Sequence, residues 1–536
     1  MNPLKLLRQR LPLPIVVLVG VLVGLFASAI VSRAVNGELM RRAWDEAVAH
    51  PGEVVTASAA TSPGARDSAS CALTGAEPSV DNTNAAAMTQ HVKQAKRRGC
   101  TACHGTAPIA LRVRVFYGLG MSLPDSGLSH DEVLERLRSL RGDDARWQDG
   151  RTFGLVYDGG PEVHAIAEDA AAMYLHENAL NTLAIPSLGQ IQREVVGTMA
   201  ALLHGDDATG FMTSGGTESI LMAVKTARER ARAERGIERG EIVLADTAHA
   251  AFHKAAHYFG LDVVLVPCAD DYRCDVDATA DAITDRTVLV VGSAPQYPHG
   301  VIDPIEDLAR IGAEASANVH VDACMGGFVL PFMERLGEDL PLWDFRVPGV
   351  TTISLDVHKL GYAPKGASII LHRNKASRRF QTYTFDAWRG GFYASPSMQG
   401  TRSGAPMAAA WAVMHRLGLE GYEQLTRTAI DTARKIQAGV RLIDGITIVG
   451  EPQAQILAIR VDDGWDARLD IFAVSEALGR RGWYLDRQNN PDSLHATVSN
   501  GNAPVADEFL TDLADAVAET LGTTTDDRDT AYATVD

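Results

Sequence analysis

A lysine at the end of an apolar strand is the residue of this sequence best suited to covalent chemistry. The segment 354–366 reads SLDVHKLGYAPKG and begins where the β-branched run Thr351–Leu355 ends. Ligands bind at the carboxyl ends of strands in open parallel sheets, and a desolvated lysine there can condense with an aldehyde cofactor. We therefore predict that Lys359 holds such a cofactor as a Schiff base, whereas a lone lysine without further support would simply be solvated.

An aspartate ends a second apolar strand. Asp322 is the last residue of the run Val319–Asp322, and a carboxylate buried there is costly unless a cationic group faces it. The protonated nitrogen of a pyridine ring is such a group, and its charge lets the ring accept the electrons of a breaking substrate bond. Asp322 is therefore predicted to pair with the ring nitrogen of the cofactor.

A glycine-rich turn offers a phosphate site. The stretch Thr213–Glu218 reads TSGGTE and opens a predicted helix over Ser219–Arg235. Its glycines expose backbone N–H groups beside the positive end of the helix, where phosphate binds, although Gly-Gly turns also serve as purely structural devices. His249 follows the predicted strand Glu241–Ala245, and it either stacks on the cofactor ring or has a structural role.

Helices and short β-branched runs alternate between about residues 190 and 375. This alternation predicts an α/β domain with a mainly parallel sheet that is covered by helices, and a smaller α/β domain follows beyond about residue 420. The predicted helices are Ile191–Leu203, Ser219–Arg235, Tyr422–Gly439, Ile471–Arg480 and Ala506–Leu521, and the predicted strands are Glu241–Ala245, Val263–Pro267, Thr287–Gly292, Val319–Asp322, Thr351–Leu355, Ile446–Val449 and Ile456–Val461.

Six consecutive parts are predicted along the chain. The linker and the tail are poor in large apolar side chains, so they cannot bury enough surface to offset the entropy of ordering. Ser129 is expected to cap the helix that opens the catalytic region. The parts are an N-terminal membrane anchor (1–35), a flexible linker (36–123), a helical segment of the catalytic region (124–190), a large cofactor-binding domain (191–420), a small C-terminal domain (421–522) and a disordered tail (523–536).

The predicted anchor is the uncharged run Leu11–Val31. As a helix rising about 1.5 Å per residue, a run of this length crosses a hydrocarbon core of about 30 Å. A cleaved signal peptide is the alternative, because basic residues precede the run and Ala27-Ser28-Ala29 resembles a cleavage site. Basic residues flank both ends, so they do not set the orientation. Cytosolic supply of the cofactor favours a catalytic domain in the cytosol.

Composition and cysteine usage exclude some classes of protein. A formal charge of −17 argues against nucleic acid as a partner. Six cysteines among 536 residues are too sparse for a disulfide framework, which indicates a reducing compartment. The stretch Cys100-Thr101-Ala102-Cys103-His104 fits the pattern of covalent haem attachment, but little apolar sequence surrounds it to wrap a haem. A chance or redox-active pair is the simpler interpretation, and no metal site is predicted.

Over roughly residues 124–520 these motifs resemble, in order, those of the sphingosine-1-phosphate lyases and, more distantly, the pyridoxal-dependent group II decarboxylases. The resemblance implies an aspartate-aminotransferase-like fold (fold type I), pyridoxal 5′-phosphate (PLP) as cofactor, and a homodimer with active sites at the subunit interface. Eukaryotic members also carry one N-terminal span and a cytosolic catalytic domain. The matching segments are 213–222, 249–259, 295–304, 320–328 and 354–366.

The resemblance also implies residue roles. Lys359 is the Schiff-base lysine, Asp322 the partner of the pyridine nitrogen and His249 the residue that stacks on the ring. Lys359, Tyr157 and Lys365 are the candidates for proton transfer. The residues expected around the phosphate are Ser214, Gly215, Gly216, Thr217 and His358, those near the substrate are Tyr157, Asn178, Asn181, Tyr297, Lys365 and Arg402, and those on a loop that reaches the partner subunit's site are Gly400, Thr401 and Arg402.

One position departs from the family pattern. Where the lyases usually carry Asn-Pro-Leu-His-Pro-Asp, residues 178–183 read NALNTL, so Asn181 replaces a substrate-side histidine. Asparagine forms hydrogen bonds but does not shuttle protons near neutral pH, which bears on the substrate rather than on the cofactor. The expected reaction cleaves a phosphorylated sphingoid base to a fatty aldehyde and phosphoethanolamine. The alternatives are an amino-acid decarboxylase, with Arg402 on the substrate carboxylate, and a catalytically silent cofactor-binding scaffold.

Overall fold

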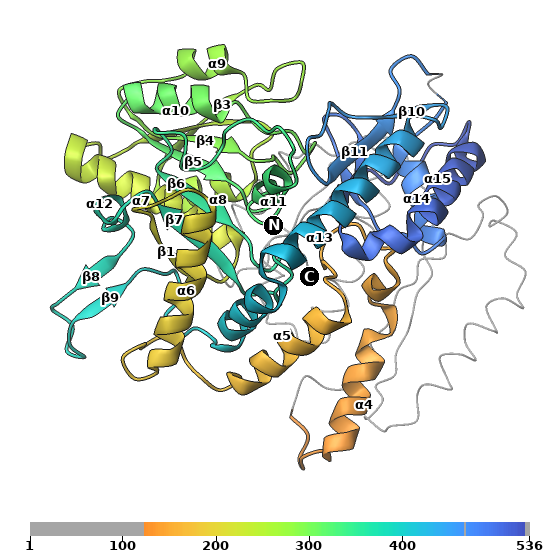
Figure 1. Cartoon of the computed structure of the whole chain (residues 1–536). Helices are drawn as coiled ribbons and strands as arrows, with labels where there is room; N and C mark the ends of the chain where they lie inside the picture. Colours follow the sequence, from red (N-terminus) through yellow and green to blue (C-terminus); the bar gives the residue numbers. More distant parts are fainter. Residues whose placement is uncertain (1–122, 466–467, 531–536) are drawn as a thin grey trace, which may run out of the picture. The chain divides into compact units, whose positions relative to one another are not determined.

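The computed structural model describes residues 123–465 and 468–530 (Figure 1). The predicted span at Leu11–Val31, the linker through residue 122 and the Cys100–His104 stretch lie outside the described residues. Among the residues that are described, no helix combines the length and the apolar character needed to cross a membrane. The same residues contain no group of three or more His, Cys, Asp or Glu side chains arranged to hold a metal ion.

A seven-stranded sheet forms the centre of the large domain, in the order β1-β7-β6-β5-β4-β2-β3. Strands β3, β2, β4, β5 and β6 run parallel, whereas β7 is antiparallel to both of its neighbours, β1 and β6. The predicted α/β fold with a mainly parallel sheet is therefore confirmed. The strands are β1 (Thr209–Thr213), β2 (Glu241–Ala245), β3 (Asp262–Val266), β4 (Thr287–Ser293), β5 (Asn318–Asp322), β6 (Thr352–Leu355) and β7 (Ser368–His372).

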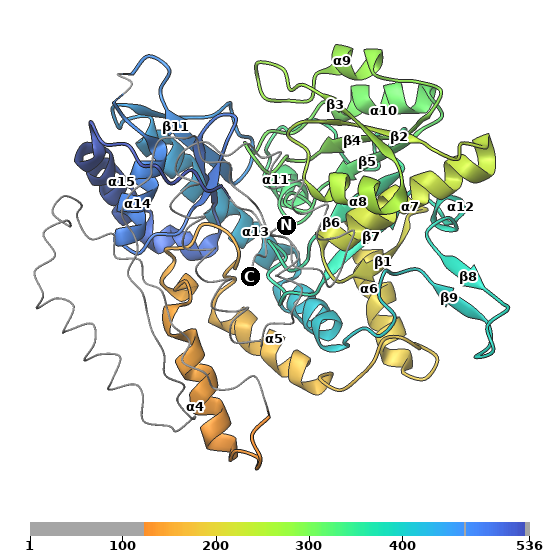
Figure 2. The same cartoon turned by 180° about the vertical axis from the view of Figure 1, so that it is seen from behind.

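Helices pack on both faces of this sheet, which explains why its central strands are apolar throughout. Ile242 and Leu244 of β2 belong to one buried cluster with α7 and α8, whereas Val243 and Ala245 belong to another with α6 and α10. Figures 1 and 2 show the helices on the two sides of the sheet. The helices are α6 (Pro186–Leu202), α7 (Gly216–Arg235), α8 (Ala251–Phe259), α9 (Val276–Asp281), α10 (Ile305–Glu314), α11 (Leu330–Arg335) and α12 (Lys375–Arg378).

A four-stranded antiparallel sheet forms the small domain, in the order β10-β11-β13-β12. Its core includes Phe472, Phe509 and also Phe153, which comes from far earlier in the chain. The backbone N–H of Phe153 donates to the carbonyl of Tyr484 at 3.0 Å, so the segment before α5 (Pro161–Met173) packs on this domain. The elements are β10 (Ile446–Ile448), β11 (Ile456–Val461), α14 (Ile471–Arg480), β12 (Asp486–Gln488), β13 (Ser493–Thr497), the 3-10 helix Asn500–Val505 and α15 (Ala506–Thr520).

Helix α13 (Ala405–Val440) joins the two domains. Gly418 breaks it into two halves, because its φ of 57° and ψ of −168° are not helical. Before the break Val413 packs in the core of the large domain, and after it Ile436 packs in the core of the small one. The sequence predicted only the second half, as Tyr422–Gly439.

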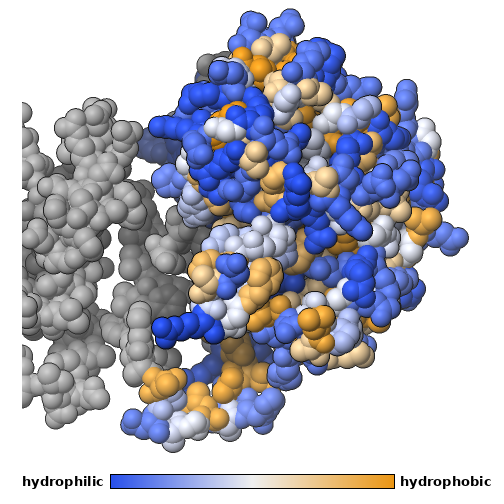
Figure 3. Space-filling model, turned by 90° about the vertical axis from the view of Figure 1, so that its left-hand side faces the viewer, coloured by the Kyte–Doolittle hydropathy of each residue, from blue (hydrophilic) through white to orange (hydrophobic). Residues whose placement is uncertain are grey.

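The first helices and one hairpin complete the described chain. Ser129 caps α4 as predicted, since its hydroxyl accepts from the backbone N–H of Glu132 at 3.3 Å. Hydrophilic residues cover most of the face shown in Figure 3, with apolar residues in separate patches. The remaining elements are α4 (His130–Leu140), the 3-10 helices Arg141–Asp143 and Trp147–Asp149, α5 (Pro161–Met173), and a hairpin of β8 (Tyr383–Phe385) and β9 (Tyr393–Ser395).

The C-terminal segment differs from the predicted disordered tail over residues 523–530. The side chain of Arg528 donates to Oδ1 of Asp470 at 2.8 Å, and the backbone N–H of Thr525 donates to Oδ2 of the same carboxylate at 3.1 Å. Asp470 is buried at the start of α14. Its polar contacts with Arg528 and Thr525 therefore hold the segment in place of the apolar contacts that the segment lacks. Residues 531–536 lie outside the described residues.

Candidate active site

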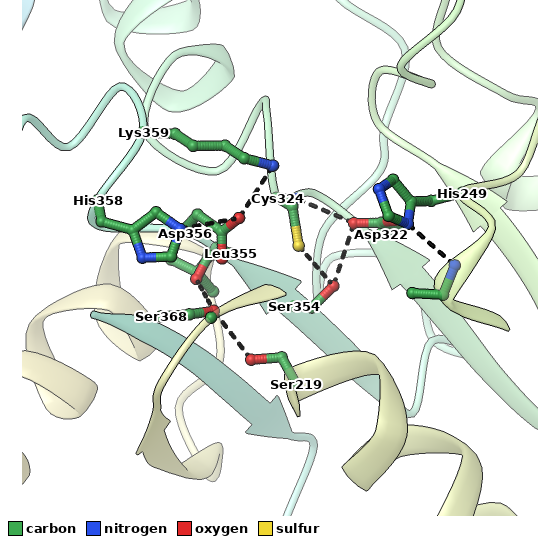
Figure 4. Close-up of polar contacts among 12 residues, drawn as sticks. Ser219, His249, Asp322, Cys324, Ser354, Leu355, Asp356, His358, Lys359 and Ser368 are labelled. Carbon is green, nitrogen blue, oxygen red and sulfur yellow. Dashed lines mark hydrogen bonds and ion pairs between the residues drawn. The ribbon is translucent and has the colours of Figure 1, made fainter. Parts of the chain in front are cut away.

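Lys359 lies four residues beyond the carboxyl end of β6, next to a buried carboxylate. Its Nζ is 3.0 Å from Oδ2 of Asp356, whose side chain is only 1% exposed (Figure 4). Burial alone would raise the pKa of Asp356, but the charges of Lys359 and His358 together with hydrogen bonds from Ser368 and Lys359 lower it below its usual value. The ion pair thus holds the amine of Lys359 near the carboxyl end of β6, where the sequence predicted a reactive lysine.

Asp322 ends β5, the strand next to β6, and the register pairs it with Ser354. Its Oδ1 accepts from the Ser354 hydroxyl at 3.2 Å and from the backbone N–H of Cys324 at 3.1 Å. These two bonds orient a buried carboxylate that the strand end would otherwise leave poorly solvated. Figure 4 shows Lys359 with Asp356 on one side of Cys324 and Asp322 on the other.

His249 lies close to Asp322, between β2 and α8. Its Nδ1 accepts from the backbone N–H of Ala251 at 3.1 Å. Burial lowers the pKa of His249, although the charge of Asp322 partly offsets this effect. The imidazole is therefore favoured in its neutral form, which suits a flat ring that stacks on another ring.

Tyr297 faces His249 edge-on, with ring centroids 6.5 Å apart, and residues of the small domain hold it in place. Its hydroxyl donates to Asp486 at 3.0 Å, and its ring stacks on His495 at 4.0 Å. A cavity of about 370 Å³ lies beside His249 and Tyr297, and residues 486–490 also line it. The small domain therefore supplies one wall of the candidate site.

The glycine turn brings the start of α7 against the lysine segment. A Cβ atom built on Gly216 would lie 2.8 Å from both Asp356 Oδ2 and Cys324 Sγ, and one built on Gly215 would lie 3.5 Å from His358. Only glycine leaves this space at the first turn of a 20-residue helix, whose N-terminal N–H groups attract anions. The turn therefore fits a phosphate group, with Thr217 next in the same helical turn.

Ser214 is turned toward a buried glutamate. Both its backbone N–H and its hydroxyl donate to Glu218 Oε2 at 2.7 Å, while Oε1 accepts from the Ser397 hydroxyl at 2.6 Å and from the backbone N–H of Met398 at 2.9 Å. Burial would raise the pKa of Glu218, but these hydrogen bonds outweigh it and lower the pKa. Ionised Glu218 therefore holds the conformation of the turn and connects it by hydrogen bonds to residues 397–398.

Replacing Gly216 tests this close packing. Gly216→Ala is expected to destabilise the protein by about 1–3 kcal/mol, because the new methyl group overlaps Asp356 and Cys324, and to weaken PLP binding. Gly197→Ala is the matched control: Gly197 is an exposed position of helix α6 with open space where its Cβ would lie, and alanine there should stabilise the protein by roughly 0.5–1 kcal/mol. Urea unfolding and PLP titration measure both effects, and equal behaviour of the two variants would contradict the packing argument.

A cluster near Lys359 contains Lys365, His358 and Tyr157. The Nζ of Lys365 donates to the carbonyl of His358 at 2.8 Å and lies 4.8 Å above the ring of Tyr157. Burial, with repulsion from Lys359, lowers the pKa of Lys365 to about 8. The imidazole of His358 is 3.8 Å from Asp356 Oδ2, and burial lowers its pKa. Lys365 can therefore exchange a proton close to neutral pH.

A separate loop cluster holds the remaining predicted residues. Oδ1 of Asn178 accepts from the backbone N–H of Arg402 at 3.3 Å, and the Arg402 guanidinium donates to the carbonyls of Met212 and Ala179, both at 3.1 Å. The exposed side chain of Asn181 accepts from the N–H of Leu183 at 3.0 Å. The bond from Arg402 to Met212 ties the loop to β1. Gly400 and Thr401 are exposed just before Arg402.

Several side chains of the site were not predicted from the sequence. Asp356 and Ser354 lie in the same segment as Lys359, so their closeness in sequence could have indicated that they belong to the site. Glu218 is likewise part of the Thr213–Glu218 turn and could have been found from its position there. Asp486 and His495 come from the small domain, and no local pattern connects them with Tyr297.

These features together fit PLP. The amine of Lys359 and the carboxylate of Asp322 lie at the ends of neighbouring strands, with the neutral ring of His249 beside them, and Gly216 leaves space at the N-terminus of α7. The sequence model of the pyridoxal-dependent decarboxylase conserved domain matches residues 119–461. The protein is therefore a PLP-dependent enzyme of the lyase class, as the sequence predicted.

Comparison with individual proteins narrows this class. A sphingosine-1-phosphate lyase of Oryza sativa is 42% identical over 408 residues, which cover 74% of each chain. The solved structure of a sphingosine-1-phosphate lyase from Burkholderia pseudomallei is 40% identical and matches with a TM-score of 0.72, over 76% of this chain and 94% of that one. The chain belongs to the sphingosine-1-phosphate lyase family. A probable L-tyrosine/L-aspartate decarboxylase of Methanothrix thermoacetophila is also 36% identical, over 74% of this chain and 97% of the relative.

Proposed function

We propose that this protein cleaves phosphorylated sphingoid bases to a fatty aldehyde and phosphoethanolamine. The observation that carries the proposal is the pairing of Lys359 with Asp356 on one strand end and Asp322 on the next, in a chain that belongs to this lyase family. When bound, PLP supplies an electron sink for the pair released as the C2–C3 bond of the substrate breaks.

Residues of the chain bind the cofactor and transfer the protons of the reaction. Lys359 would hold the cofactor at its aldehyde carbon, and Asp322 would keep positive charge on its ring nitrogen. The start of α7 binds the cofactor phosphate, with His358 beside it. Lys365 and Tyr157 hold the proton that must leave the C3 hydroxyl and the proton that must return to C2.

The pH dependence of the reaction tests the role of Lys365. Its pKa is about 8, so it is protonated below pH 8 and neutral above it. We propose that protonated Lys365 donates the proton that returns to C2, so kcat/KM should fall as the pH rises through about 8. Lys365→Gln should be slower and lack this limb, whereas Lys435→Gln, a surface residue paired with Asp507, should keep it. A wild-type rate that rises through this range would contradict the assignment.

A homodimer is the assembly we propose. The hairpin of β8 and β9 with the residues around it exposes Tyr383, Phe385, Trp388 and Phe392, the last of them to 70%. Such a cluster of exposed aromatic side chains is typical of an interaction surface, and it precedes the exposed Gly400 and Thr401, which the family resemblance puts at a partner's site. A single-chain molar mass at concentrations that support activity would contradict this assembly.

We also propose that Leu11–Val31 anchors the protein to a membrane, with the catalytic domain in the cytosol. The length and composition of the run support this, and anchoring brings the site close to a lipid substrate. Recovery of the full chain in the soluble fraction without detergent would contradict it.

An amino-acid decarboxylase is the second candidate. Asn181 in place of the family histidine and the 36% identical probable decarboxylase favour it. Against it, both terminal nitrogens of Arg402 already donate to backbone carbonyls, so this guanidinium is not presented to a substrate carboxylate.

Product analysis separates the two candidates. Detergent-solubilised full-length protein with PLP is mixed either with dihydrosphingosine phosphate or with tyrosine and aspartate. Mass spectrometry should detect a long-chain aldehyde and phosphoethanolamine in equal amounts, and nothing from unphosphorylated dihydrosphingosine. Release of carbon dioxide from an amino acid, with the sphingoid phosphate unchanged, would overturn the lyase proposal and support the decarboxylase.

A further inference from the structure

Two cysteines face each other in the loop between β3 and α9. Cys268 and Cys274 form an isolated antiparallel bridge. The N–H of Ala269 donates to the carbonyl of Arg273 at 2.8 Å, and the N–H of Asp275 donates to that of Pro267 at 3.4 Å. Since these hydrogen bonds flank the cysteines on both sides, the pair occupies a non-hydrogen-bonded position of the ladder.

This position brings two side chains close enough for a disulfide. Directly opposed residues of this kind have Cα atoms about 4.5 Å apart and point to the same face of the ribbon. Disulfides join residues whose Cα atoms are about 4.4–6.8 Å apart. Cys268 and Cys274 can therefore be bridged without moving the backbone far, and both are free thiols in this structure.

The two thiols differ in accessibility. Cys268 is partly exposed and lines the cavity of about 370 Å³ beside His249 and Tyr297. Cys274 is only 2% exposed, and its Sγ lies 3.3 Å from the hydroxyl of Thr279. A small oxidant that enters the cavity thus meets Cys268 first, with Cys274 directly behind it.

We propose that Cys268 and Cys274 are a thiol modification site at which a peroxide produces a reversible disulfide. The Cys268 thiolate attacks one peroxide oxygen, so an S–O bond forms, the O–O bond breaks and hydroxide leaves. The sulfur of Cys274 then attacks the Cys268 sulfur, the S–O bond breaks, and the oxygen leaves as water with the thiol proton. Overall two thiols lose two electrons and one peroxide is reduced to two waters.

The surroundings suit a slow, protective site. Burial and the charge of Asp246 raise the pKa of Cys268, and burial with Asp303 raises that of Cys274 to about 12. A thiol with a raised pKa is rarely ionised at neutral pH, so it reacts slowly with peroxide. Because its thiolate is not stabilised, the disulfide it forms is not a strong oxidant. Because Cys274 resolves the first oxidation product of Cys268, the pair prevents irreversible oxidation at the wall of the cavity. This inference does not depend on the identity of the substrate.

Peptide mapping tests the proposal, because Arg273 places a trypsin site between the two cysteines. The PLP-loaded full-length protein is treated with hydrogen peroxide, denatured, alkylated and digested without reduction. Residues 255–273 and 274–286 should be recovered mostly as one linked species that dithiothreitol separates, while Cys324 on the 311–335 peptide stays open to alkylation. Cys274→Ser should instead collect one or more oxygen atoms on the 255–273 peptide.

Two results would overturn the proposal. One is separate, fully alkylated 255–273 and 274–286 peptides under conditions that oxidise a simple dithiol. The other is linkage of Cys268 to a different cysteine. If the Cys274→Ser variant fails to fold, the linkage measured in the native chain still decides the question.

Discussion

Lys359→Ala should abolish both the visible absorbance of the bound cofactor and the turnover of sphingoid phosphate. The reason is chemical, because alanine has no amine to bond to the aldehyde of PLP. Loss of a group that forms the covalent bond should lower kcat by on the order of 10³-fold or more. Absorbance spectra of the PLP-treated protein and aldehyde release under saturating substrate measure the two effects.

Lys359→Arg is the matched control for folding. The alanine variant removes the cation 3.0 Å from a carboxylate that is 1% exposed, and breaking such a buried pair costs about 3–5 kcal/mol. Arginine keeps the positive charge beside Asp356 but cannot form the bond to PLP, so it should be more stable than the alanine variant and equally inactive. Full absorbance or full turnover in either variant would remove Lys359 from its assigned role.

Asp322→Asn should lower kcat by roughly 10²- to 10³-fold, a range typical of losing one preorganised electrostatic group, with PLP still bound. Asparagine is close to the size of aspartate and keeps the hydrogen bonds from Ser354 and Cys324, but it cannot stabilise a protonated ring nitrogen. The electron sink is therefore weakened while the fold stays intact. Steady-state kinetics and the stoichiometry of bound PLP measure the two quantities separately.

Ser354→Ala gives the comparison for this prediction. It removes one hydrogen bond to Asp322 at 3.2 Å and leaves the carboxylate charge in place. Its effect on kcat should be clearly smaller than that of Asp322→Asn. An equal loss in both variants would mean that the orientation of residue 322, and not its charge, is what the reaction needs.

Two largely buried strands, one in the parallel sheet and one in the antiparallel sheet, could be predicted closely. Glu241–Ala245 and Ile456–Val461 have the bounds that the sequence indicated, since their apolar runs stop at turn residues. Short strands such as Asp486–Gln488 are polar and partly exposed, so no periodic pattern distinguishes them from loops. The first half of α13 was also missed, because Gly418 interrupts its helical pattern.

The sequence predicts which candidate site residues lie close together only where strand order alone sets the geometry. Asp322 ends one strand and Lys359 follows the adjacent parallel strand, so their proximity follows from the fold. The contacts of Tyr297 with Asp486 and His495 depend on how the small domain packs on the large one, and local sequence carries no information about that packing. The same holds for Arg402, which was assigned to the substrate and is bonded to the carbonyls of Met212 and Ala179.

Attachment of PLP to Lys359 is the claim on which the whole account depends, and peptide mapping tests it directly. Borohydride treatment of the PLP-loaded protein makes the bond between lysine and cofactor permanent, and a modified lysine resists trypsin. We expect the cofactor on a single peptide, residues 347–365, uncleaved after Lys359. A cofactor recovered on another lysine, or cleavage at Lys359 in protein that retains full activity, would contradict the account.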